Sequence, residues 1–151
     1  MIRDLEKNRK RMLLSDFSLD DEYKKCLVGF HAFTGNDYVS AFFKKGKMVC
    51  WKKMVKLPEF MTLFTKLGDH WEVNRQLVCE MEAFVCNLYG CKKSLSENAA
   101  RVELFQNKHM HQSKVIDLSL LPPCLSSLEL HILRANSVSY THLTLPTILL
   151  V

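Results

Sequence analysis

The sequence predicts a mainly α-helical protein, and local helix signals lead to that prediction. Residues 75–89 carry apolar side chains at helical spacing. Asn74 precedes this run as an N-cap residue would, and Gly90 follows it where a helix would end. Proline and glycine divide much of the remaining chain into segments of helical length. The apolar positions of the long run are Leu77, Val78, Met81, Phe84, Val85 and Leu88.

The first 25 residues are polar and charged, with a short helix expected over residues 19–25 that Ser18 or Asp20 would cap. Residues 27–33 (LVGFHAF) fit either a buried strand or the first turn of a buried helix. Residues 34–37 (TGND) are typical of a turn.

Helices are then expected over residues 48–57 and from residue 58 or 59 to 67, because Pro58 ends one helix and suits the first turn of the next. Gly68 would end the second. A further helix is expected from Ser96 to about residue 108, and a last amphipathic helix over residues 126–135, after the break at residues 121–123.

The totals bound the class of protein. A chain of 151 residues is one domain at most, and its formal charge of +5 is compatible with an anionic partner. Six scattered cysteines and a charged start without a signal peptide favour reduced thiols in a nuclear or cytoplasmic protein. Residues 7–11 are either a nuclear address or a solvated basic segment. No apolar run approaches the length of a membrane span.

Two features of residues 27–56 suggest chemistry. Asp37 lies in a turn after an apolar run, where a carboxylate can reach a metal at the edge of a core. The segment between Tyr38 and Pro58 also contains lysines and no acid, which attracts phosphate groups. Gly46 would leave backbone N–H groups open to an anion at a helix entrance. The lysines are Lys44, Lys45, Lys47, Lys52, Lys53 and Lys56.

Each feature also has an ordinary structural explanation. An aspartate in a turn is usually part of an Asx turn or a helix cap. A lysine run is usually a solvated face, and Trp51 is better explained as a core anchor than as a base-stacking platform.

The same segment resembles a known pattern. It reads HAFTGND, SAFF, KGK and then Trp51, and it is similar to a group of transposon-associated animal proteins with lines such as HAFTGCDTTSAFFGKGKKTAW. Leu88 and Tyr89, residues 121–123, His131 and residues 134–136 extend that resemblance over about residues 27–136. Residues 35–54 also resemble the Gly-Cys-Asp turn and Gly-x-Gly-Lys hairpin of PIN and flap-endonuclease-like nucleases.

The resemblance implies a fold, a cofactor and a partner. The chain would be the C-terminal, helical half of an α/β domain whose parallel-sheet half is missing. Asp37 matches an acidic ligand for Mg²⁺ or Mn²⁺, and Gly46 and Lys47 match the hairpin that grips DNA. Asn36 replaces the usual cysteine, and Lys44 replaces the first glycine of the hairpin, which removes backbone freedom there.

Metal-dependent phosphodiester cleavage needs several converging carboxylates. In the family, most of them precede the Gly-Cys-Asp turn, and no second core carboxylate accompanies Asp37 here. We therefore assign no catalytic residue. We expect an inactive fragment that retains at most weak nucleic-acid binding, with DNA favoured over RNA.

The end of the chain changes character. The ten residues 138–147 back-translate codon by codon onto a sequence that resembles a transposase adapter used in sequencing libraries. Apolar and threonine residues alternate there, so a genuine strand is the alternative. The expected division is residues 1–25 as a polar segment, 26–136 as the partial nuclease-like domain, and 137–151 as a non-native tail.

Three other functions remain open. Cys86, Cys91, His109 and His111 offer zinc ligands, although the His-x-His spacing is short for a zinc finger. A Cys–His nucleophile has no recognisable motif. A helical protein-interaction module would use residues 75–89 and the last helix, whose apolar faces core packing also explains.

Overall fold

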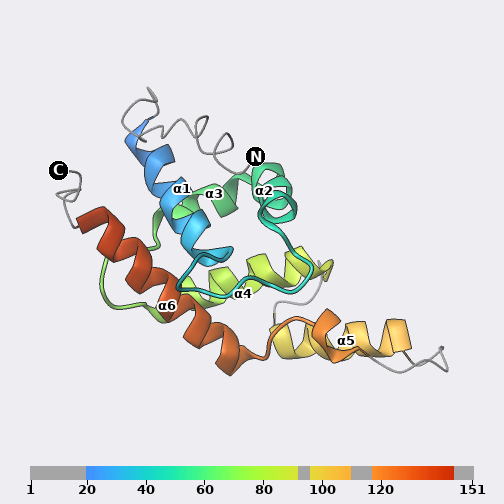
Figure 1. Cartoon of the computed structure of the whole chain (residues 1–151). Helices are drawn as coiled ribbons and strands as arrows, with labels where there is room; N and C mark the ends of the chain where they lie inside the picture. Colours follow the sequence, from blue (N-terminus) through green and yellow to red (C-terminus); the bar gives the residue numbers. More distant parts are fainter. Residues whose placement is uncertain (1–19, 92–95, 110–116, 145–151) are drawn as a thin grey trace, which may run out of the picture.

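The computed structural model describes residues 20–91, 96–109 and 117–144, and these residues form a mainly α-helical protein, as predicted. Figure 1 shows α1 and α6 side by side across the body of the molecule, with α5 at one edge. The helices are α1 (Asp21–Phe33), α2 (Lys47–Lys56), α3 (Pro58–Thr65), α4 (Arg75–Tyr89), α5 (Glu97–His109) and α6 (Leu125–Thr144), with a 3₁₀ turn, η2 (Leu118–Leu120), before α6.

Helix α1 decides between the two predictions for residues 27–33 in favour of a helix. It joins that apolar run to the helix expected over residues 19–25, because Cys26, Phe30 and Phe33 recur at helical spacing and are all buried. Asp20 occupies the N-cap position, but its side chain makes no capping hydrogen bond, and Ser18 lies outside the described residues. Helix α1 also crosses the expected division between residues 25 and 26.

Helix α4 has the bounds that the sequence predicts. The Asn74 side chain accepts a hydrogen bond from the backbone N–H of Leu77 at 2.7 Å, and Gly90 ends the helix with a φ of 93°. Helix α2 ends before Pro58 as expected, and α3 ends at Thr65, two residues before the predicted end.

The core forms where α1, α3, α4 and α6 meet. Phe64 of α3 lies between two other buried rings, with centroid distances of 5.7 Å to Phe33 and 5.0 Å to Phe84. These tilted and edge-on contacts are the arrangements that aromatic quadrupoles favour. The apolar face of α4 is buried here, so ordinary core packing accounts for it.

Helix α6 is longer than predicted. The expected helix over residues 126–135 continues to Thr144, so residues 137–144 are helical and the alternative of a strand there is wrong. The continuation follows from packing, because Val138 contacts the core and Ser139 is fully buried. Gly68, with a φ of 88°, lies so close that an added Cβ would be 2.7 Å from Ser139. The expected division at residues 136 and 137 therefore falls inside a continuous helix.

Asn136 of α6 ties down the segment between α3 and α4. Its side-chain oxygen accepts the backbone N–H of Gly68 at 2.8 Å, and its amide donates to the carbonyls of His70 at 2.9 Å and Trp71 at 3.0 Å. Asn136 is buried, so its side chain supplies the hydrogen bonds that these backbone groups would otherwise form with water.

Two buried acids join α4 to α5. The Glu82 carboxylate accepts the backbone N–H of Glu97 at 2.7 Å, at the first turn of α5. Both carboxylate oxygens of Glu97 are buried without a hydrogen-bond partner. Burial, and then the charge of Glu82, raise the pKa of Glu97 to about 8, although the charge of Arg101 opposes them.

Two further properties concern the class of protein. All six cysteines are free thiols. Within residues 20–91, 96–109 and 117–144, no helix has the length and apolar character that crossing a bilayer requires.

Replacing Asn136 by alanine is expected to lower the free energy of unfolding by about 2–3 kcal/mol, because one buried N–H and two carbonyls lose their partner. Urea denaturation followed by circular dichroism measures the effect. Asn98→Ala is the matched control, since Asn98 is exposed on α5 and should change stability by less than about 0.5 kcal/mol. Equal effects of the two substitutions would contradict a stabilising role for the hydrogen bonds of Asn136.

Glu97 is expected to contribute stability that is lost as the pH rises from about 5 to about 8, whereas the lowered pKa values of His31 and His131 have the opposite effect near pH 6. The folded state holds a proton on Glu97 up to about pH 8, whereas the unfolded chain releases it near the ordinary value of 4.5, so raising the pH through this window favours unfolding. Urea midpoints measured across this range test it. Glu97→Gln should gain stability relative to the unmodified chain as the pH rises through this window, and a difference between the two that does not change with pH would contradict the assignment to Glu97.

Candidate nucleic-acid interface

The loop between α1 and α2 contains the turn that the sequence singles out. Gly35 has a φ of 106°, and an added Cβ would be 2.7 Å from Ala41. The Asn36 side chain accepts the backbone N–H groups of Tyr38 at 2.7 Å and Val39 at 2.9 Å, which is an Asx turn. The turn is therefore built by Asn36, at the position where the resembling proteins carry cysteine.

Asp37 is exposed at this turn, and its carboxylate has no hydrogen bond or ion pair within the described part of the chain. Asp37 acts electrostatically on His31, whose pKa is lowered mainly by burial while Asp37 opposes the shift. No group of three or more His, Cys, Asp or Glu side chains that could bind a metal occurs among the residues described. One carboxylate is too few for the metal centre that the resemblance implies, so these residues alone do not fit Mg²⁺ or Mn²⁺.

Lys47 is exposed, but its ammonium group is already engaged within the fold. Its ammonium group donates to the carbonyl of His31 at 3.1 Å, the hydroxyl of Thr34 at 3.1 Å and the carbonyl of Gly35 at 2.5 Å. It thus satisfies acceptors at the C-terminus of α1, where the helix dipole favours a positive charge. Partial burial lowers the pKa of Lys47. The structure assigns this lysine a role in joining α1 to α2.

The hairpin before α2 shows the effect of the missing glycine. Lys44 has a φ of 55°, in the left-handed region, and it is the one non-glycine residue with positive φ among those described. Its ammonium lies 5.1 Å from the Phe43 ring centroid, and that of Lys45 lies 4.9 Å from the Tyr89 centroid. Gly46 is the exposed N-cap residue of α2, and an added Cβ there would meet nothing within 4 Å.

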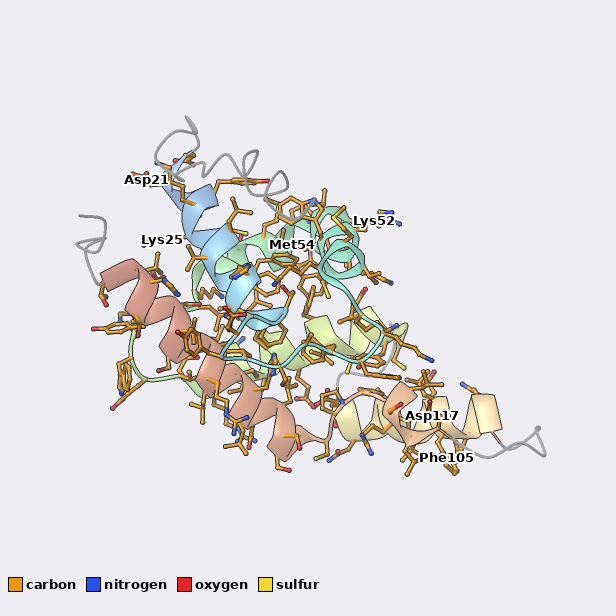
Figure 2. The ribbon with its side chains drawn as sticks, viewed as in Figure 1. Asp21, Lys25, Lys52, Met54, Phe105 and Asp117 are labelled. Atoms are coloured by element: carbon orange, nitrogen blue, oxygen red, sulfur yellow. The ribbon has the colours of Figure 1, made fainter. Side chains whose placement is uncertain are left out.

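Helix α2 places its remaining lysines outside. Lys52 and Lys56 are exposed and Lys53 is half-buried, and none of the three forms an ion pair within the described residues. In Figure 2 the Lys52 side chain points away from the molecule, whereas Met54 points inward. Three of the lysines that the sequence singles out therefore share one helix.

Trp51 is a core anchor, as the sequence analysis favours. Its ring packs edge-on against Phe30 at a centroid distance of 5.4 Å and against Tyr23 at 6.4 Å. Both neighbours belong to α1, so Trp51 attaches α2 to that helix.

The zinc alternative gains no support from its cysteines. Cys86 and Cys91 are both buried, and burial is the main cause that raises the pKa of Cys86 to about 12. A thiol held protonated is a poor metal ligand. His111 and the side chain of His109 lie outside the described residues.

Sequence reasoning did not find the roles of His131 and Asn136. The His131 ring is buried, and its Nε2–H donates to the carbonyl of Phe33 at 2.8 Å. The partners are 98 residues apart, so no local pattern indicates this contact. The only available signal was the resemblance, which includes both residues.

Comparison of the chain with models of protein families, with curated proteins and with solved structures gave no match.

Replacing Lys44 by glycine is expected to raise the free energy of unfolding by about 0.5–1 kcal/mol. Relief of about 1–2 kcal/mol of left-handed strain outweighs the greater freedom of glycine in the unfolded chain. Lys52→Gly is the control, because it removes the same charge from the exposed face of α2 and should cost about 1 kcal/mol. Thermal or urea denaturation measures the stability of both variants. A Lys44→Gly variant less stable than the unmodified chain would contradict backbone strain at Lys44.

Proposed function

We propose that this chain is a nucleic-acid-binding piece of a PIN or flap-endonuclease-like protein, and that it binds phosphate backbones electrostatically and without sequence specificity. The observation that carries the proposal is the outer face of α2 and the adjoining hairpin, where Lys44, Lys52 and Lys56 are exposed and no acid lies between Tyr38 and Pro58. Asp117 interacts electrostatically with Lys44, whereas Lys52, Lys53 and Lys56 form no ion pair within the described residues. These α2 lysines are available to displace the counterions of a nucleic acid.

Four of the lysines that the sequence singles out are available to a nucleic acid. We define the lysine surface as Lys44, Lys52, Lys53 and Lys56. It excludes Lys47, whose ammonium already has three acceptors, and Lys45, which packs on Tyr89. Gly46 is exposed beside the surface, and its backbone can approach a strand closely. The Trp51 ring packs against α1, so it is not available to stack on a base. The partner is DNA in preference to RNA, by the resemblance.

We propose no hydrolysis by these residues. Asp37 would supply one ligand for Mg²⁺ or Mn²⁺ in an intact nuclease-like parent, and the described residues do not bring further ligands to it. A nuclear or cytoplasmic location fits a nucleic-acid partner and remains part of the proposal.

One observation favours a second function, protein binding. Leu118 of η2 and Leu130 and Leu133 of α6 are exposed apolar side chains near the C-terminal part of the fold. Such side chains suit a protein partner when they are contiguous. The face would then lie on α6 and η2, and not on α4, whose apolar residues are in the core.

Binding to a fluorescent duplex, measured against salt concentration, tests the lysine surface. Replacing Lys52, Lys53 and Lys56 by glutamine should weaken binding at low salt by at least about tenfold and reduce the slope of log K against log salt by about 2.7, since each of the three phosphate contacts contributes about 0.9.

The matched control replaces Lys24, Lys25 and Lys66 by glutamine. It changes the net charge equally, but these lysines pair with Asp21, Asp69 and Glu80. It should leave the salt slope nearly unchanged. Equal losses from the two triple variants, or no binding by the unmodified chain, would overturn the proposal.

A further inference from the structure

A cavity separate from the lysine surface lies where the α1–α2 loop, α5, η2 and α6 meet. Its volume is about 430 Å³, within the usual range for small-molecule sites. Phe42, Leu118 and Leu130 supply apolar walls, and Arg101, Arg134 and His131 supply nitrogen atoms. The rest of the lining consists of serine, proline, alanine and leucine residues, and the lining contains no carboxylate.

The two arginines are available to a ligand. Arg134 makes no hydrogen bond or ion pair within the described part of the chain. Arg101 donates one hydrogen bond, to the carbonyl of Pro122, and a guanidinium has five N–H groups. Arg101 also lies near Glu97, but the raised pKa of about 8 leaves that acid largely neutral at pH 7, so it does not cancel the positive charge.

These observations specify the chemistry of the ligand. A guanidinium can donate two parallel hydrogen bonds to the oxygens of a phosphate group. The lining contains no carboxylate that would compete with the phosphate for these hydrogen bonds. The apolar walls beside the arginines suit a flat or apolar body attached to that phosphate. His131 already uses its Nε2–H on Phe33, so it shapes the cavity and does not supply that proton to a ligand.

We propose that this cavity binds a phosphate monoester attached to an aromatic body, such as a nucleotide, with Arg134 and Arg101 holding the phosphate. The source is either a free nucleotide or the phosphorylated end of a nucleic-acid strand. The site does not depend on the lysine surface, and neither proposal requires the other.

Titration of the full chain with adenosine 5′-monophosphate, followed by amide NMR shifts, is the test. Shifts at Phe42, Leu118 and Leu130 are expected, with inorganic phosphate and adenosine each binding more weakly than the nucleotide. Arg134→Gln should weaken nucleotide binding roughly tenfold, as expected for loss of a charge-assisted pair. Arg75→Gln, an exposed arginine on α4 outside the cavity, should have no effect.

Three results would overturn the proposal: no shift at the cavity residues, adenosine binding as tightly as the nucleotide, or equal losses from Arg134→Gln and Arg75→Gln. The lysine triple variant should still bind the nucleotide, which separates this site from the lysine surface. Competition by short oligonucleotides identifies the source of the phosphate. A strand that competes only when it carries a 5′ phosphate supports a strand end, and no competition by either strand supports a free nucleotide.

Discussion

The C-terminus of α1 is the constraint on which the rest of the structure depends. The last carbonyls of a helix have no partner within the helix, so donors from other parts of the chain must satisfy those that water does not reach. Lys47 from α2 and His131 from α6 donate to carbonyls at this end, and Thr34 donates to Phe30 at 2.7 Å. One helix end thus fixes the positions of a neighbouring helix, a loop and the last helix.

This arrangement changes the meaning of the residues that carry the resemblance. Gly35 permits a close approach to Ala41, Asn36 builds the turn, and Lys47, His131 and Asn136 hold elements together. A pattern that suggests catalysis in the sequence is accounted for here largely by hydrogen bonding within the fold. Asp37 is the exception, because its exposed carboxylate has no structural role that the described residues reveal.

The parts of the fold that local signals control were predictable. Asn74, Gly90 and Pro58 act within a few residues of where they lie, so the bounds of α4 and the end of α2 follow from the sequence. The strain at Lys44 also follows, because the missing glycine is visible there. The hydrogen bonds of the Lys47 ammonium to the end of α1 were not predictable. Their acceptors lie 12 to 16 residues earlier, and the sequence did not decide whether a helix ends there. The extra length of α6 was missed because its reason is burial of Ser139 beside Gly68, a contact without a local signature.

That contact also sets a size limit on the chain. A Cβ added at residue 68 would be 2.7 Å from Ser139, so residue 68 has room only for glycine. Ser139 itself is fully buried, and its hydroxyl has no hydrogen-bond partner among the described residues. An unpaired buried hydroxyl costs about 1–3 kcal/mol, so alanine would suit position 139 better. The helix crossing thus requires glycine on one side and gains nothing from the polarity that serine brings on the other.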